Sequence, residues 1–238
     1  MLPKIDVPVY DLQLLSLKDK VQFRPFTVKE EKLFLMASES EDKDTILTTI
    51  KQVVNNCLVS KVDVDNLPVF DLEYLFINLR AKSVNEEVKL NFKCNNIVED
   101  KKCNHIVELV FNLLDIKPST KGEHKNKVEV SKDLGIMLKY PSVKSVTEHS
   151  DKNETDAIFD IMVDCIDYIY DKEEIYYSKD TPRKELVEFV ESLQSKSLES
   201  MKEFFDTMPK IKSENNFKCT KCGFEDKLVV EGIENFFV

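Results

Sequence analysis

The first third of the chain combines a proline-interrupted segment with apolar residues at helical spacing. Residues 1–26 contain three prolines, which predicts an extended arm with short strands rather than a helix. Thr27 and Glu30 form a capping box, in which a hydroxyl and a carboxylate satisfy free N–H groups at a helix start. The segments that then fit helices are 28–38, 43–59 and the stretch that begins near Asp71. Residues 1–83 are therefore predicted to be an arm followed by a helical N-terminal unit.

Beyond residue 84 the apolar positions change to a period of two, which is typical of half-buried strands. The alternating apolar residues are Val88, Leu90 and Phe92, then Val107, Leu109, Phe111 and Leu113, then Val128 and Val130, and finally Leu134, Ile136 and Leu138. The connections are too short for crossover helices, so the strands must pair antiparallel. Residues 84–141 are predicted to form a central antiparallel sheet.

A helical period returns in the C-terminal half of the chain. The polar stretch 142–153 predicts a loop. Apolar spacing and a Thr-Pro helix start then predict three helices: 155–170, one that begins at Thr181-Pro182, and one that ends before Pro209. Residues 142–210 are thus predicted to form a helical C-terminal region, and the fold class is α+β.

The last segment, 211–238, has a strand-like pattern over 226–231 and then an apolar tail, Phe236-Phe237-Val238. Chain ends are usually polar and frayed, so an apolar tail needs a partner. It can pack back on the sheet of its own chain or dock on another subunit, and the sequence leaves both interpretations open.

The glycine content of the 238-residue chain excludes several enzyme classes. There are four glycines, and the closest two are Gly223 and Gly232. Loops that cradle phosphates need clustered glycines, because the backbone must turn tightly and bring its N–H groups to the ligand. A Rossmann cofactor site, a P-loop and a glycine-rich kinase loop are therefore excluded, as is a Gly-x-Ser-x-Gly nucleophile elbow.

The net charge and the hydropathy of the chain limit the kinds of partner it can bind and the cellular compartment in which we expect it. The net charge is −10, which disfavours binding to nucleic acid, since phosphate backbones require a basic face. No segment approaches the roughly 18 apolar residues of a membrane span, and the N-terminus has no signal-peptide pattern. We therefore expect a protein of the reducing cytoplasm with no membrane or nucleic-acid partner, whose six cysteines are not disulfides.

Four of the cysteines fall in a repeated pattern. The run Asn91-Phe92-Lys93-Cys94 recurs as Asn216-Phe217-Lys218-Cys219, and each copy is followed by a second cysteine, Cys103 or Cys222. Cys-x2-Cys-Gly is the pattern of a zinc knuckle, in which glycine permits the left-handed turn beside the sulfurs. Cys94, Cys103, Cys219 and Cys222 are therefore the candidate ligands of a structural Zn²⁺, held by a zinc-ribbon-like pair of hairpins.

The first half of this pattern is irregular. Eight residues separate Cys94 from Cys103, which is wide for a knuckle. His105 could replace one cysteine ligand, and the alternative interpretation is that no metal is bound. The two other cysteines, Cys57 and Cys165, lie on apolar helix faces and are predicted to be core residues.

No catalytic arrangement emerges from the sequence. The His-x-Glu and Pro-Cys-x-x-Cys motifs of zinc deaminases and the His-Glu-x-x-His motif are absent. His124 and His149 lie in polar segments and are predicted to be exposed, and carboxylate pairs such as Asp164 and Asp167 are predicted to belong to a solvated face. The protein is predicted not to be an enzyme.

Several runs, in order along nearly the whole chain, carry a family likeness. They are Phe23-Arg24-Pro25-Phe26-Thr27-Val28-Lys29-Glu30-Glu31-Lys32, Phe70-Asp71-Leu72-Glu73-Tyr74-Leu75, Leu79-Arg80-Ala81-Lys82-Ser83, Tyr140-Pro141-Ser142, Glu188-Phe189-Val190-Glu191-Ser192-Leu193, Phe204-Phe205-Asp206-Thr207-Met208-Pro209, Cys219-x2-Cys222-Gly223 and Glu231-Gly232-Ile233-Glu234-Asn235-Phe236-Phe237. Together these runs resemble the hub assembly proteins of T4-type bacteriophage baseplates.

The resemblance implies a non-enzymatic role in building the central hub, as an assembly factor or as a subunit, with other phage baseplate hub proteins as partners. It implies a location in the host cytoplasm during assembly, with the virion tail baseplate as the place of a permanent subunit. It offers no catalytic residues. Two rival functions remain: a zinc-ribbon regulator that binds nucleic acid, and an enzyme of a type that the sequence does not reveal.

Overall fold

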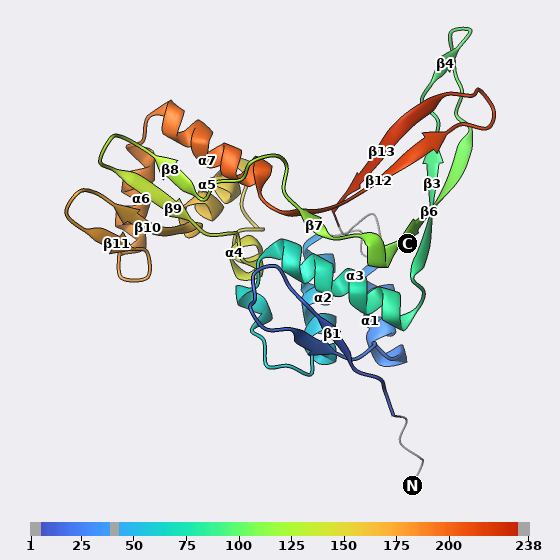
Figure 1. The fold of residues 1–238 in the computed structure, drawn as a ribbon, viewed down its shortest axis with the longest axis horizontal. Coiled ribbons are helices and arrows are strands. Elements are labelled where there is room, and N and C mark those ends of the chain that lie inside the picture. Colours follow the sequence, from blue (N-terminus) through green and yellow to red (C-terminus); the bar gives the residue numbers. More distant parts are fainter. Residues whose placement is uncertain (1–5, 39–42, 233–238) are drawn as a thin grey trace. The chain divides into compact units, whose positions relative to one another are not determined.

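A computed structural model describes residues 6–38 and 43–232 of the chain (Figure 1). Helices and antiparallel strands are mixed along the sequence, which confirms the α+β class. The chain divides into two compact units: residues 1–62, 70–118 and 210–238 form the first, and residues 63–69 and 119–209 form the second. The division into four segments predicted from the sequence stays a prediction. The apolar tail, 236–238, lies outside the described residues.

The first compact unit begins with the predicted arm and helices. Strands β1 (Tyr10–Leu12) and β2 (Val21–Phe23) pair antiparallel. The helices are α1 (Val28–Ser38), α2 (Lys43–Cys57) and α3 (Val69–Ser83). Helix α2 ends two residues earlier than predicted, because Leu58 leaves the helix to form a β-bridge with Phe23.

Two buried carboxylates hold this helical region together. Asp71 on α3 is fully buried, and its two oxygens each accept a backbone N–H, from Leu15 and from Ser16, at 2.9 Å. Glu30 is also buried, and one of its oxygens accepts the N–H of Thr27 at 2.8 Å, which is the carboxylate half of the predicted capping box. The Thr27 hydroxyl donates to the same oxygen at 2.6 Å instead of accepting an N–H. Buried charges need such partners, since an unsatisfied carboxylate would be very costly.

The rest of the first unit is a pair of β-hairpins with small strands around them. Strand β3 (Glu87–Lys93) pairs with β6 (Ile106–Asn112), and β12 (Lys210–Lys218) pairs with β13 (Glu225–Glu231), both antiparallel. We call these two β-ladders the paired hairpins. The short elements that accompany the first unit are β4 (Ile97–Val98), β5 (Lys101–Lys102), the 3₁₀ turn η2 (Leu113–Asp115) and β7 (Pro118–Ser119), which adds to β12.

The paired hairpins lie side by side in Figure 1 and share one apolar core with α3. Its fully buried members include Ile77 from α3, Phe111 from β6 and Ile211 from β12. Strand residues contribute alternate side chains to this core, as the period of two requires. The core therefore fixes the root of both hairpins on the helical region.

The second compact unit has its own sheet, whose strands run in the order β11-β10-β9-β8. The strands are β8 (Lys127–Glu129), β9 (Gly135–Leu138), β10 (Ile166–Tyr170) and β11 (Ile175–Tyr177).

The same unit contains four helices, α4 (Val143–Glu148), α5 (Glu154–Asp164), α6 (Arg183–Glu191) and α7 (Ser195–Thr207). The 3₁₀ turn η1 (Val64–Asn66) contacts α4. The strands expected in one central sheet are thus divided between two sheets.

Two sequence predictions in this unit are wrong. The expected loop contains helix α4, whose N-terminus is capped by the hydroxyl of Ser142. The expected helix 155–170 ends at Asp164, and β10 follows. A register irregularity between Ile166 and Tyr168 lets Ile166 and Ile169 both face the core, so a strand shows the three-residue spacing of a helix.

Within the part of the chain that the structure describes, no helix has the length and apolar character needed to cross a bilayer.

The capping carboxylate gives a prediction for acid stability. Burial raises the pKa of Glu30, but hydrogen bonds from Thr27 and Arg24 outweigh it and lower the pKa from 4.5 to about 2. Because the pKa of Glu30 is lower in the folded state, its ionised carboxylate stabilises the fold. This contribution to the free energy of unfolding is complete above about pH 4.5 and is lost as the pH falls toward 2. We expect Glu30→Gln to lower the free energy of unfolding at pH 7 by about 1–3 kcal/mol and to flatten its decline between pH 5 and 2.

Glu31→Gln is the matched control, because Glu31 is the exposed neighbour in the same helical turn. Urea unfolding at a series of pH values measures both variants. Equal unfolding free energies for the two variants at pH 7 would contradict the role given to Glu30.

Candidate metal centre

The four candidate cysteines lie at the far end of the paired hairpins. Cys94 directly follows β3 and Cys103 precedes β6, while Cys219 directly follows β12 and Cys222 lies in the turn before β13. The repeated Asn-Phe-Lys-Cys run therefore ends a strand in both hairpins. Because the hairpins pack against each other, two pairs of cysteines more than a hundred residues apart in sequence are brought together.

The sulfur geometry fits a single tetrahedral metal ion. The Sγ atoms of Cys94 and Cys222 lie 3.7 Å apart, those of Cys103 and Cys219 lie 3.8 Å apart, and all four lie within 4.8 Å of one another. Zn–S bonds of about 2.3 Å in a tetrahedron place the sulfurs about 3.8 Å apart. A disulfide requires about 2.05 Å, so these four cysteines are free thiols.

The backbone of the second hairpin is that of the predicted knuckle. The N–H of Cys219 donates to the carbonyl of Phe224 at 2.8 Å, and the N–H of Gly223 donates to the carbonyl of Cys219 at 2.9 Å. Gly223 has a φ of 72°, the left-handed conformation for which the motif requires glycine.

The first hairpin repeats this arrangement with different residues. The N–H of Cys94 donates to the carbonyl of His105 at 2.8 Å, and the N–H of Asn104 donates to the carbonyl of Cys94 at 3.0 Å. Asn104 has a φ of 52° and directly follows Cys103, as Gly223 follows Cys222. Asparagine tolerates the left-handed region better than most residues, so it can replace glycine here.

The wide spacing of the first pair has a structural explanation. Residues 95–102, which we call the finger, form a two-stranded excursion in which β4 pairs with β5. The N–H of Cys103 donates to the carbonyl of Asn96 at 2.8 Å and closes the base of the finger. The eight-residue gap is therefore a knuckle with an inserted finger rather than a departure from a knuckle.

The four thiols differ in environment. The N–H of Phe224 and the side-chain amide of Asn96, 3.6 Å from the sulfur, lower the pKa of Cys222 to about 6. Burial raises the pKa of Cys94 to about 12. Thiolates are the metal ligands, so loading a metal must release protons from the buried thiols.

His105 does not join the sulfur cluster. Its Nε2 lies 2.9 Å from the hydroxyl of Thr220, within hydrogen-bond distance. The candidate ligand set among the described residues is therefore the four cysteines, with His105 beside it. Cys57 and Cys165 are buried away from the cluster, as predicted, and burial raises their pKa values to about 11 and about 12.

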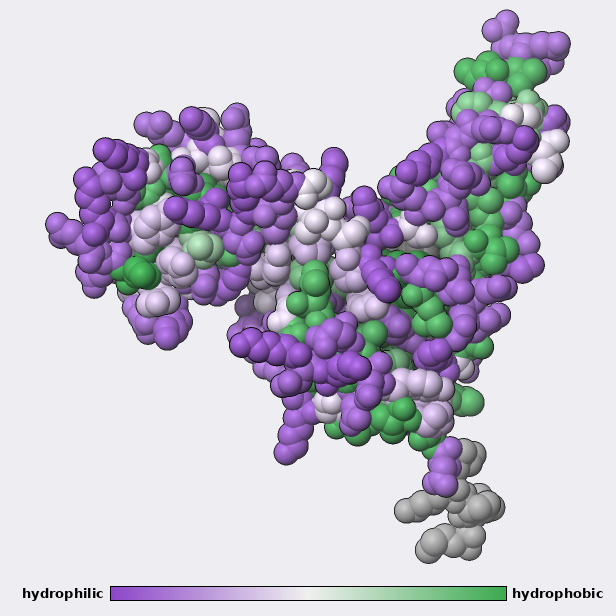
Figure 2. Space-filling model, viewed as in Figure 1, coloured by the Kyte–Doolittle hydropathy of each residue, from purple (hydrophilic) through white to green (hydrophobic). Residues whose placement is uncertain are grey.

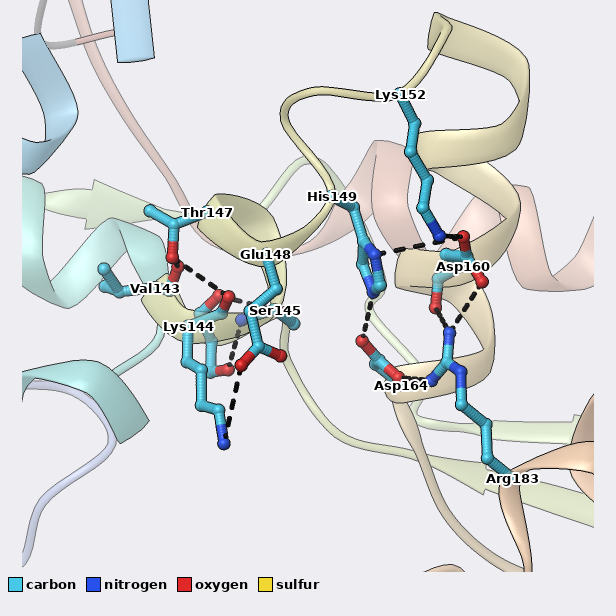
Figure 3. Close-up of polar contacts among 11 residues, drawn as sticks. Val143, Lys144, Ser145, Thr147, Glu148, His149, Lys152, Asp160, Asp164 and Arg183 are labelled. Atoms are coloured by element: carbon cyan, nitrogen blue, oxygen red, sulfur yellow. Dashed lines mark hydrogen bonds and ion pairs between the residues drawn. The ribbon is translucent and has the colours of Figure 1, made fainter. Parts of the chain in front are cut away.

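A second polar cluster, in the other compact unit, is one that the sequence did not reveal (Figure 3). His149, predicted to be exposed, is buried, and its Nε2 lies 2.7 Å from an oxygen of Asp164. Its Nδ1 lies 3.9 Å from Asp160, and Arg183 bonds to both of these carboxylates. Lys152 pairs with Asp160 and lowers the pKa of that carboxyl, and Arg183 adds to the effect.

This cluster joins α4, α5 and α6 through charge pairs. His149 ends α4, Asp160 and Asp164 lie one turn apart on α5, and Arg183 begins α6. The Nδ1 atom of His149 is enclosed by the protein and has no hydrogen-bond partner. The imidazole thus has no open position at which a substrate could meet it.

His124, also predicted to be exposed, is half-buried. Its ring packs against Tyr140 and Phe204, and Nδ1 lies 3.0 Å from the Thr207 hydroxyl. Burial lowers its pKa.

An open cavity of about 960 Å³ lies near this histidine, between the β8–β9 hairpin and α7. Its charged lining contains both signs: Lys125 pairs with Glu123, and Lys127 pairs with Glu129. The His149 cluster does not line it, so cavity and histidine are separate features.

One family model matches the chain. It is described as T4 bacteriophage base plate protein, and it covers residues 7–238. No curated protein and no solved structure matches the chain.

The cysteine geometry predicts the effect of losing one thiol. We expect Cys219→Ser to abolish stoichiometric zinc binding and to lower the free energy of unfolding by more than about 3 kcal/mol, because metal binding contributes to folding. Metal content measured by mass spectrometry, together with thermal unfolding, provides the test.

Cys57→Ser is the matched control, since Cys57 is equally buried but lies outside the cluster. This variant should lose some packing energy and keep its metal. An unchanged melting temperature and metal content in Cys219→Ser would contradict a structural metal at this site.

Proposed function

The chain belongs to the T4 bacteriophage base plate protein family, and from this membership we propose that it acts in assembly of the central hub. In this proposal the chain works by protein–protein contacts, as an assembly factor or as a hub subunit, and its partners are other base plate hub proteins. The observation that carries the proposal is the extent of the match. It spans residues 7–238, and so includes both compact units and both hairpins rather than one module.

The arrangement of polar groups supports a non-catalytic role. The buried His149 is surrounded by structural ion pairs, and its second nitrogen faces Asp160 instead of an open cavity. The open cavity is lined by both lysines and glutamates, of which Lys125 pairs with Glu123 and Lys127 pairs with Glu129. General acid–base catalysis requires a group within reach of a bound substrate, and the enclosed His149 does not offer one.

We also propose that the four cysteines hold one structural Zn²⁺. Four thiolates in a closed tetrahedron are typical of structural rather than catalytic zinc, which keeps an open position. The ion would join the two hairpins at an end where Phe217 packs with the half-buried Phe92, Val107, Leu109 and Leu228 in a small apolar cluster. Its role would be to keep the far end of the paired hairpins rigid enough to present a surface.

The family is named for the base plate of a phage tail, where hub assembly would bring the chain together with its partners. Assembly would take place in the host cytoplasm. An assembly factor would then leave, whereas a subunit would remain in the virion.

Affinity purification of the tagged chain from phage-infected cells tests this proposal. We expect hub proteins of the same phage to co-purify with the chain. Comparison with purified virions separates the two roles: absence from virions identifies an assembly factor, and a fixed stoichiometry in virions identifies a subunit.

Failure to recover any tail protein would contradict the proposal. Salt-sensitive binding of the purified chain to duplex DNA would then favour the rival regulator, since counterion release makes such binding depend steeply on salt.

A further inference from the structure

Asn96, at the base of the finger, contacts three of the four candidate ligands through three different groups. Its carbonyl accepts the N–H of Cys103 at 2.8 Å, and its own backbone N–H donates to the sulfur of Cys94. Its side-chain Nδ2 lies 3.6 Å from the sulfur of Cys222, within hydrogen-bond distance for a sulfur acceptor. Cys94 and Cys103 belong to the same hairpin as Asn96, and Cys222 belongs to the other, so this one residue joins the two halves of the site.

The finger fixes the backbone from which Asn96 makes these contacts. Cross-strand pairing sets Ile97 opposite Lys102, and the bond from Cys103 to Asn96 continues the same ladder toward the cysteines. The peptide groups on both sides of Asn96 are therefore held by hydrogen bonds. A side chain on a backbone fixed in this way loses little freedom when its amide meets the sulfur of Cys222.

The corresponding position in the second hairpin is different. Lys221 lies two residues after Cys219, as Asn96 lies two residues after Cys94, and it directly precedes the second cysteine of its pair. Lys221 is exposed, whereas Asn96 is half-buried. The amide contact to a sulfur of the opposite hairpin is therefore made from the first hairpin, the one that carries the finger.

The sulfur that this amide meets is one that solvent can reach. Two of the four cysteines are buried, whereas Cys103 and Cys222 are half-buried. Figure 2 shows that the far end of the paired hairpins projects from the helical region of the same unit, so water has access to its sides. Four thiolates around one divalent ion carry a net charge of about −2, which N–H donors to the sulfurs stabilise. Cys222 accepts two such donors, the N–H of Phe224 and the amide of Asn96.

We propose that Asn96 is a positioning residue of the metal centre: its side-chain amide holds the half-buried Cys222 in place across the two hairpins and so determines how tightly a bound ion is retained. The inference rests on the proposed structural Zn²⁺. Partners outside the ligand shell orient the ligands and tune their affinity for the metal, and Asn96 would have this role. The finger would serve it by fixing the backbone of Asn96.

Competition with a chelator tests this role in the full-length, zinc-loaded chain. We expect Asn96→Ala to weaken zinc binding about 10–100-fold, the usual effect of losing a partner of a metal ligand. Asn96→Leu should weaken it equally, because leucine is close to asparagine in size but has no donor. Both variants keep the backbone bonds to Cys94 and Cys103. Asn95→Ala is the matched control, since Asn95 is an exposed asparagine beside Asn96, and it should bind zinc within about twofold of the unmodified chain.

A spectroscopic measurement distinguishes this role from a loss of packing. Co²⁺ can replace Zn²⁺ in a site of four thiolates, and its thiolate-to-metal charge-transfer absorption reports on the sulfurs. A hydrogen bond lowers the energy of the sulfur lone pairs, so its loss moves this absorption to longer wavelength. We expect that shift in Asn96→Ala and Asn96→Leu, and none in Asn95→Ala.

The outcomes separate this inference from the proposed zinc site. If the unmodified chain binds no Zn²⁺, the proposed site fails and the inference fails with it. If the chain binds Zn²⁺ and the two Asn96 variants retain it as tightly, with the same cobalt absorption, the inference alone is overturned. It is also overturned if Asn96→Leu restores the affinity that Asn96→Ala loses, because the side chain would then act by filling space rather than by donating a hydrogen bond.

Discussion

The convergence of four thiols is the feature that brings the far ends of the two paired hairpins to one point. A two-stranded hairpin is marginally stable by itself, and each of the paired hairpins consists of little more than one β-ladder at its far end. Their shared core lies near α3, whereas the cysteine end has a separate, smaller cluster around Phe217. An ion held by Cys94, Cys103, Cys219 and Cys222, as proposed, would therefore add to the apolar contacts that hold this end together.

The cysteine cluster was largely predictable because its signal is local. A Cys-x2-Cys-Gly turn follows from backbone sterics, and the repeated Asn-Phe-Lys-Cys run identified its counterpart. The finger was not predictable, since nothing in the sequence states that residues 95–102 leave the ladder and return to it. Asn104 is the signal that could have revealed it, because asparagine after a second cysteine can replace the glycine of a knuckle.

The structure of the second compact unit was harder to predict, because it depends on a register shift and on tertiary contacts rather than on local sequence. The segment that became β10 has apolar residues three apart, and a local register shift, invisible in sequence, made that spacing compatible with a strand. His149 lies in a polar stretch, and its burial depends on Asp160, Asp164 and Arg183, which only tertiary packing brings around it. The helices α6 and α7 were predictable because their apolar periodicity is local. The predicted cap of α6 is wrong in detail, since Pro182 is the N-cap and the Thr181 hydroxyl donates to the carbonyl of Tyr177 instead.

The order in which the cysteines are synthesised has a consequence for the cell. Cys222 lies 128 residues after Cys94. At translation rates of about 5–20 residues per second, the first hairpin leaves the ribosome roughly 6–25 s before its counterpart exists. During that interval its two thiols are a half-site, open to oxidants and to competing metals. A chain whose translation stops before Cys219 would keep that half-site permanently, so a reactive thiol pair would mark an unfinished copy of this protein.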